Sequence, residues 1–443
     1  MTQPQSKKDA YDIIITKLRY PASRTLRKIF ELWATPEEAE VIVELPSSHM
    51  QFTGSTYSVT ASGETPAGEI ARKLNRDIKT VEEQLENLFQ KGLIREIVTP
   101  EGKTHYTRIG GIEGISDSIL FRFGPLYLEH DQNAPLHKHE FRDEKTREIA
   151  DLWNKFFYEE WYRWERPMEL IHRRMAVREE GAVTGNEAAR TFGMMPCFSA
   201  LVKSEPLGTE ILADWDLREI ARRGEAAGGM LTRCCTCRTR ARHCDRPVWT
   251  CGASYEGMPG LPAWYSKDRR NTQKKLSAEE WLEGMGTNEI DLGMTHIGTA
   301  GRKGCTCCND CCNWIAPLRL YTDPWEGAHP SPYRAIVNQE ICEGCTKYCV
   351  PRCNFRVIVG RTDPSSGKVK AFIDLEKCVG CGQCVIGCPI EGAVKLELAT
   401  KIGAPVSPML ARLKIPDRAL NTTRLFGGLA EPGPFESPLS SDK

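Results

Sequence analysis

The chain of 443 residues carries 59 Lys and Arg against 59 Asp and Glu, so its formal net charge is zero. This balance excludes a strongly basic global field as the basis for binding nucleic acid or an anionic membrane. With 40% hydrophobic residues, the chain has enough apolar material for about three folded domains. It has no apolar run of about 18 residues and no secretory h-region at its start, which predicts a cytoplasmic protein without a membrane span.

The N-terminal region begins with a polar stretch, residues 1–24, which we expect to be peripheral. The pattern over Thr25–Glu44 predicts two short helices, the second opened by Thr35 as N-cap with Pro36 at the first helical position. Residues 48–64 are rich in Ser, Thr and Gly, which is typical of a loop or an extended segment.

A helix-turn-helix pattern follows. Thr65-Pro66 opens one helix, and residues 78–91 form a second with its apolar side chains on one face. The segment 93–107 then predicts a β-hairpin. Two helices followed by a hairpin resemble a winged-helix domain, which we place at residues 25–110.

The charge of the second helix bears on what this domain would bind. Glu82, Glu83 and Glu86 outnumber Lys79, and carboxylates at a DNA groove would be repelled by phosphates. Arg72, Lys73 and Arg76 on the preceding helix and turn only partly offset them. Docking to a protein is therefore the favoured interpretation, and DNA is a disfavoured partner.

Residues 111–335 form a middle region that we predict to be helical and rich in cysteine. Its segment 144–180 has a helical composition and an aromatic stripe at helical spacing, for which core packing is the usual role. The stripe consists of Trp153, Phe156, Phe157, Trp161, Tyr162 and Trp164.

Cysteine distribution is the most informative feature, because 18 of the 19 cysteines lie between Cys234 and Cys388. Such density would indicate disulfides in a short secreted chain. Here the chain is long, and its cysteines stand at metal-ligand spacings, which favours metal. The lone Cys197 is expected to be a small buried hydrophobe.

The last cysteine set matches the bacterial ferredoxin run, in which one tight loop supplies three corners of a [4Fe–4S] cube and the fourth cysteine reaches the other cluster. A zinc site would favour two separated CxxC pairs instead. The set reads Cys378-x2-Cys381-x2-Cys384-x3-Cys388-Pro389.

A near-copy lies upstream, with one extra residue between its second and third cysteines and Asn354 in place of the proline: Cys342-x2-Cys345-x3-Cys349-x3-Cys353. Residues 355–360 and 369–375 flank a turn and predict a hairpin between the sets. This layout predicts a domain with two [4Fe–4S] clusters at residues 336–400. By the crossing rule, Cys342, Cys345, Cys349 and Cys388 hold one cube, and Cys378, Cys381, Cys384 and Cys353 hold the other.

Nine further cysteines form two groups in the middle region, with Cys234 adjoining the first. Thiolate-rich groups select zinc or iron–sulfur over hard metals, so the alternatives are a third iron–sulfur cluster, structural zinc, or redox-reactive thiols. Arg233, Arg238, Arg240 and Arg242 interleave with the first group and would lower thiol pKa values and offset cluster charge. The candidate ligands are Cys235, Cys237, Cys244, Cys251, Cys305, Cys307, Cys308, Cys311 and Cys312.

The order of these features resembles a family of 4Fe-4S binding proteins common in anaerobic bacteria and archaea. The resemblance covers roughly residues 25–398 and rests on the winged-helix-like start, the segment Cys235–Cys251, the double-cysteine box Cys307–Cys312 and the ferredoxin pair. It implies a protein that serves redox enzymes or multi-subunit oxidoreductases. It assigns no chemistry to the middle cysteines.

The sequence therefore predicts an electron-transfer protein with several domains of α+β fold. A subunit of an anaerobic oxidoreductase, with redox proteins as partners, is favoured over a stand-alone enzyme. One alternative is a redox-sensing transcription regulator that uses the winged helix. Another is a reductase with a catalytic cluster in the middle domain, although no nucleotide-binding or flavin signature accompanies it. Residues 401–443, with many prolines, are predicted to form an extended arm.

Overall fold

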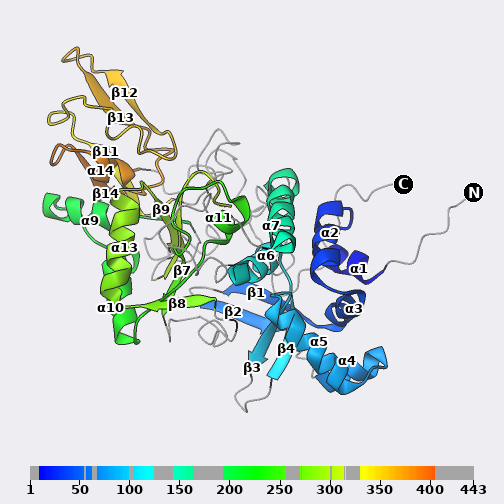
Figure 1. Cartoon of the computed structure of the whole chain (residues 1–443). Helices are drawn as coiled ribbons and strands as arrows, with labels where there is room; N and C mark the ends of the chain where they lie inside the picture. Colours follow the sequence, from blue (N-terminus) through cyan, green and yellow to red (C-terminus); the bar gives the residue numbers. More distant parts are fainter. Residues whose placement is uncertain are drawn as a thin grey trace, which may run out of the picture. The chain divides into compact units, whose positions relative to one another are not determined.

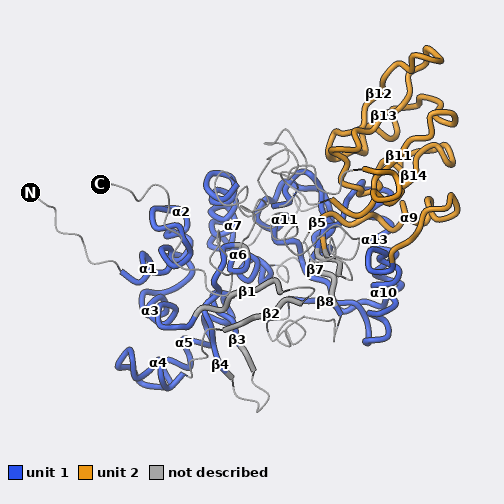
Figure 2. Tube along the Cα trace, turned by 180° about the vertical axis from the view of Figure 1, so that it is seen from behind, with its two compact units in different colours: residues 1–165, 213–297, 301–317 blue, residues 166–212, 298–300, 318–443 orange. Residues whose placement is uncertain are grey.

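The computed structural model divides the chain into two compact units, coloured separately in Figure 2. Unit 1 comprises residues 1–165, 213–297 and 301–317, and unit 2 comprises residues 166–212, 298–300 and 318–443. No helix in the described part of the chain is long and apolar enough to cross a bilayer. The structure describes residues 9–53, 56–61, 67–98, 104–123, 143–162, 193–255, 270, 272–299, 302–313, 315 and 330–404.

Helices and one sheet form the N-terminal part of unit 1 (Figure 1). They are α1 (Ala10–Lys17), α2 (Arg24–Trp33), α3 (Pro36–Glu44), β1 (Ser47–Thr53), β2 (Thr56–Ala61), α4 (Ala67–Leu74), α5 (Ile78–Gln90), β3 (Ile94–Val98) and β4 (Thr104–Ile109). The predicted start of α3 is confirmed as a capping box, in which the Thr35 hydroxyl accepts from Glu38 N and the Glu38 carboxylate accepts from Thr35 N.

The strands pair in the order β2-β1-β4-β3. The predicted hairpin is confirmed, since β3 and β4 are antiparallel with Ile94 opposite Arg108. The segment expected to be a loop or extended contains the paired strands β1 and β2, and β1 also runs parallel to β4. Its Thr, Tyr and Val residues suit a pleated strand. Assignment of the whole domain to the winged-helix class stays a prediction.

The remaining elements of unit 1 surround the middle cysteines, and they combine helices with a sheet, whereas the sequence predicted a helical region. The strands that pair within this unit follow the order β9-β10-β7-β6-β8. The elements are α6 (Ile112–Leu120), α7 (Glu144–Phe156), the π-turn η3 (Phe157–Trp161), the 3-10 turn η6 (Ala213–Trp215), α10 (Leu217–Ala226), β6 (Met230–Arg233), α11 (Thr236–Ala241), β7 (Cys251–Tyr255), β8 (Gln273–Leu276), α13 (Ala278–Ile290), β9 (Thr295–Thr299) and β10 (Arg302–Cys307).

The aromatic stripe on α7 and η3 is core, as predicted. Five of its six side chains are buried, and the rings of Phe157 and Trp161 make an edge-on contact with centroids 5.1 Å apart. Helix α7 packs on α2, so the stripe joins the N-terminal helices into one core (Figure 1). Trp164 and the rest of the predicted helix to residue 180 lie outside the described residues.

Unit 2 contains two antiparallel strand pairs, β11 with β14 and β12 with β13. The second pair is the hairpin predicted between the two ferredoxin-like sets, with Ile358 opposite Ile373. Of the predicted arm, residues 401–443, only residues 401–404 are described. The elements are β5 (Gly193–Met195), α9 (Phe198–Ser204), the 3-10 turn η5 (Glu205–Leu207), β11 (Tyr333–Val337), β12 (Ile358–Thr362), β13 (Val369–Ile373), α14 (Gln383–Gly387) and β14 (Val394–Leu398).

Candidate metal centres

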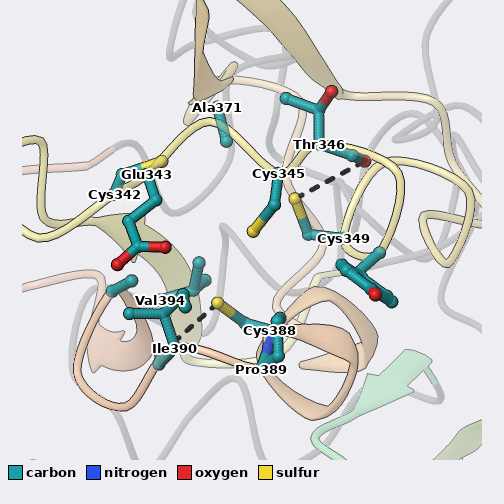
Figure 3. Close-up of a pocket in the computed structure, with 12 residues that line it drawn as sticks. Cys342, Glu343, Cys345, Thr346, Cys349, Ala371, Cys388, Pro389, Ile390 and Val394 are labelled. Carbon is teal, nitrogen blue, oxygen red and sulfur yellow. Dashed lines mark hydrogen bonds between the residues drawn. The ribbon is translucent and has the colours of Figure 1, made fainter.

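The first thiol pocket lies in the loop after β11. It is partly open to solvent and is lined by Cys342, Cys345, Cys349 and Cys388. Figure 3 shows the sulfurs of Cys345, Cys349 and Cys388 facing the space between them. The loop turns at Gly344, whose φ is +79° and whose missing Cβ would collide with the carbonyl of Val369, so only glycine fits there.

The second pocket is also lined by four cysteines. It too is partly open to solvent, and its cysteines are Cys378, Cys381, Cys384 and Cys353. Gly380, between the first two cysteines, has a φ of +70°, and a Cβ there would collide with the carbonyl of Tyr333. The backbone of this loop therefore lies directly on β11, which fixes the direction of the thiols.

The structure thus brings together the two sets of four cysteines that the crossing rule predicts. The thiols are directed into the pockets without bonding to one another: Cys349 and Cys388 donate to backbone carbonyls, and Cys353 accepts from Val357 N. Burial, with the neighbouring thiols Cys378 and Cys381, raises the pKa of Cys384 far above its usual value. Binding iron must displace such protons, so ligation and deprotonation are coupled.

Neighbours of the second pocket come from distant sequence. Cys197, buried as predicted, donates its backbone N–H to the carbonyl of Cys381 at 2.9 Å, and Gln383 donates to the Cys197 sulfur at 3.4 Å. Arg334 donates to the carbonyls of Ser331 and Tyr333. Burial lowers the pKa of Arg334 to about 10, while the nearby Cys378 thiol opposes this. Sequence spacing gave no signal for these contacts, because Cys197 precedes the motif by more than 180 residues.

The middle cysteines separate into two groups within unit 1. Cys244, which follows α11, meets Cys308 and Cys311, which follow β10, and the three sulfurs lie within 4.8 Å of one another. The Sγ–Sγ distance is 3.5 Å between Cys244 and Cys308 and 3.9 Å between Cys308 and Cys311. All three side chains are buried. We call this group the thiol triad.

Hydrogen bonds within the thiol triad shift the pKa values of its thiols in opposite directions. Donation from Cys244 and Cys311, with a smaller effect of Arg238, holds the pKa of Cys308 well below its usual range. The same bond to Cys308 raises the pKa of Cys244 to about 11.

The other six predicted ligands form a second group, in which each thiol interacts with the next. The series is Cys235, Cys237, Cys312, Cys307, Cys305 and Cys251. Cys251 and Cys305 face each other across β7 and β10 with 3.2 Å between their sulfurs. Cys234 points elsewhere, toward the carbonyls of Leu120 and Phe121. All nine predicted middle cysteines are thus gathered, but into groups of three and six.

Two of the four interleaved arginines are buried at the thiols. Arg238 donates to the carbonyls of Pro247 and Thr306, each at 2.9 Å, and to the Thr250 hydroxyl. Arg240 lies over the Phe157 ring and donates to the Tyr162 hydroxyl. By contrast, Arg242 pairs with Asp151, and Arg233 lies over the Phe121 ring.

A buried polar pair supports β10 and was missed by sequence reasoning. His296 Nε2 lies 2.6 Å from the Glu289 carboxylate, and its Nδ1 lies 3.3 Å from the Thr306 hydroxyl. Thr306 separates Cys305 from Cys307, and its carbonyl accepts from Arg238. The seven-residue spacing of Glu289 and His296 joins a helix end to a strand, which no local motif marks.

Comparison with known proteins agrees with the geometry of unit 2. Residues 341–394 match the family model of the 4Fe-4S dicluster domain. No curated protein and no solved structure matches the chain. The protein is therefore of mixed α+β fold and contains a C-terminal dicluster ferredoxin domain. It is an iron–sulfur protein, and that domain implies two [4Fe–4S] clusters.

Proposed function

We propose that this chain is an electron-transfer subunit of a multi-subunit oxidoreductase in anaerobic metabolism. The observation that carries this proposal is the pair of four-thiol pockets in unit 2. A [4Fe–4S] cluster, when bound, supplies one-electron oxidation and reduction. The eight cysteines that line the pockets are the proposed ligands, in the two sets described above.

Short segments of the chain link the two pockets. Cys349 and Cys353 stand four residues apart yet line different pockets, and Cys384 and Cys388 do the same. Each short segment therefore joins the two sites covalently and fixes their separation. Such an arrangement holds two redox centres close enough for electrons to pass between them.

The lining of the pockets suits electron transfer better than catalysis. Of the residues that line them, only Glu343 carries an ordinary charged side chain. The remaining lining is apolar side chains, thiols, one threonine and one tyrosine. No pair of acid and base faces a substrate-sized space in these pockets, so we assign the bond chemistry to a partner.

A redox protein is the proposed partner. In unit 2, the apolar side chains of Ile341, Tyr348, Val359 and Val369 are exposed, and Tyr348 also lines the first pocket. An apolar rim at a redox site suits the small interfaces of transient electron-transfer complexes. DNA is disfavoured, because Glu82 and Glu83 on α5 are exposed and would face phosphates. No observation on the described residues specifically favours a transcription regulator or a reductase.

A reductive titration of the full chain, purified without oxygen, tests this proposal. We expect the dicluster domain to take up about two electrons reversibly and to return them to a one-electron acceptor such as a viologen dye. The Cys384→Ser variant should lose about half of this capacity. A protein that contains iron but cannot be reduced and reoxidised would contradict the proposal.

A further inference from the structure

The thiol triad has the spacing of ligands to one metal ion. A thiolate lies about 2.3 Å from tetrahedral zinc, which places two such sulfurs about 3.8 Å apart. The measured distances of 3.5 Å and 3.9 Å lie on either side of this value. Two of the three sulfur pairs therefore match the edges of a single tetrahedron, and the third pair, Cys244 and Cys311, lies within 4.8 Å.

The same spacing is too small for a [4Fe–4S] cube. Each iron of a cube takes one thiolate, so the ligating sulfurs stand outside separate corners and do not touch. The pockets of unit 2 fit this wider arrangement, because the hydrogen bonds that their thiols form among the described residues go to the backbone and none joins two thiols. In the thiol triad, by contrast, the sulfurs are in direct contact.

Charge gives an independent argument for an anionic metal centre. Arg238 is 1% exposed, forms no ion pair with any carboxylate among the described residues, and has no hydrogen-bond partner for its Nε. A buried cation without a counter-ion is costly, so an anion is expected beside it. A divalent ion with three thiolates carries one net negative charge, which Arg238 would neutralise.

We propose that Cys244, Cys308 and Cys311 bind one divalent zinc-class metal ion, separate from the iron–sulfur clusters of unit 2. The ligands come from the loop after α11 and the loop after β10, so the ion joins two segments that are more than 60 residues apart. Soft thiolate ligands in tetrahedral geometry select zinc over harder divalent ions. Arg238 is the counter-ion of the centre.

Metal analysis of full-length variants tests this proposal. The chain is purified without oxygen, and zinc, iron and acid-labile sulfide are measured per chain. We expect Cys308→Ser to lose about one zinc while its iron and sulfide stay at the wild-type level. The matched control is Cys234→Ser, another buried thiol nearby, which should keep the full zinc content.

The outcomes separate this proposal from the proposed electron-transfer function. Unchanged zinc in Cys308→Ser would overturn the metal site and leave the clusters of unit 2 unaffected. Loss of iron and sulfide in place of zinc would overturn it too, because the thiol triad would then belong to a cluster. Loss of reversible reduction in the wild type would instead contradict the proposed function alone.

A second measurement tests the metal site even if the Cys308→Ser variant does not fold. Wild-type protein is stripped of zinc by a chelator and titrated with Co²⁺, whose ligand-field spectrum reports coordination. We expect tetrahedral cobalt bands with strong thiolate charge transfer, and loss of the intensity of one such centre in Cys311→Ser. Octahedral cobalt bands in the wild type would overturn the proposal.

Discussion

Arg238 sits where the two groups of middle thiols meet. Burial alone would lower its pKa, but the thiols of Cys235, Cys308 and Cys311 together raise it well above the usual value. A guanidinium that interacts with both groups stabilises the thiolate form of each. Its hydrogen bonds go to backbone carbonyls and a threonine hydroxyl, which carry no charge. Its positive charge is therefore left to compensate the negative charge of the thiolates.

Replacement of this cation should weaken metal binding. We expect Arg238→Gln to lower the affinity of the thiol triad for Co²⁺ by about 10- to 100-fold, the range seen when a supporting residue of a metal site is removed. Competition with a chromophoric chelator measures the change. The exposed Arg222→Gln serves as control, because among the described residues Arg222 bonds to Glu219 on its own helix and not to the thiols. Equal affinities in the two variants would show that Arg238 is not the counter-ion.

Asp117 predicts a dependence of stability on pH. Its carboxyl accepts a hydrogen bond from the Thr236 hydroxyl at 2.6 Å, and burial raises its pKa to about 7. A raised carboxyl pKa favours the neutral acid in the folded state. Its contribution is therefore fully present below the usual value of 3.8 and is lost as the pH rises through about 7.

The Asp117→Asn variant should remove this dependence. Because an amide oxygen can still accept from Thr236, we expect little change in stability at pH 4 and a gain of up to about 4 kcal/mol at pH 8 relative to the wild type. Denaturant unfolding at the two pH values measures the difference. A gain of the same size at both values would mean that ionisation of Asp117 is not its cause.

At the scale of elements, the turn at Gly380 fixes the second cluster loop against β11. Gly380→Ala combines a positive φ with a collision against the Tyr333 carbonyl, so we expect loss of the second cluster, about four iron per chain. Gly367→Ala is the control, since Gly367 has a similar φ of +68° but open space at its Cβ. Iron analysis of both variants separates the collision from the backbone strain. Retention of all iron in Gly380→Ala would contradict this role.

Local chemistry predicted some elements well. The N-cap at Thr35, the helix that begins at Ile78 and the hairpin of β12 and β13 all depend on residues close in sequence, and the structure contains them. Helix α1 was missed because residues 1–24 look polar overall. Its buried Ile14 and Ile15 occupy only one turn.

The sequence predicts the ligand sets of the two cluster pockets but not the grouping of the middle cysteines. The ferredoxin spacing carries its own pairing rule, so the sets around Cys345 and Cys384 follow from the sequence alone. The division of the middle cysteines does not, because β7 and β10 pair Cys251 with Cys305 over a long stretch of chain. A long-range strand register leaves no trace in local spacing. The same holds for the contact between Cys197 and Cys381.

At the scale of the whole molecule, the chain combines a dicluster domain in unit 2 with a separate thiol site in unit 1. The two sites use the same ligand atom in different ways. Thiols spread around an open pocket suit a cluster that exchanges electrons, whereas thiols in contact suit a single ion without redox chemistry. We therefore propose electron transfer for unit 2, and the proposed zinc-class ion would stabilise the fold of unit 1.

The most direct test of the central claim counts iron and acid-labile sulfide in the full chain purified without oxygen. Wild type is compared with a double variant, Cys345→Ser with Cys384→Ser, which removes one ligand from each pocket of unit 2. We expect the double variant to lack about eight iron and eight sulfide per chain relative to the wild type, whatever the middle cysteines hold. Equal iron and sulfide contents in the two proteins would contradict the claim that unit 2 binds two clusters.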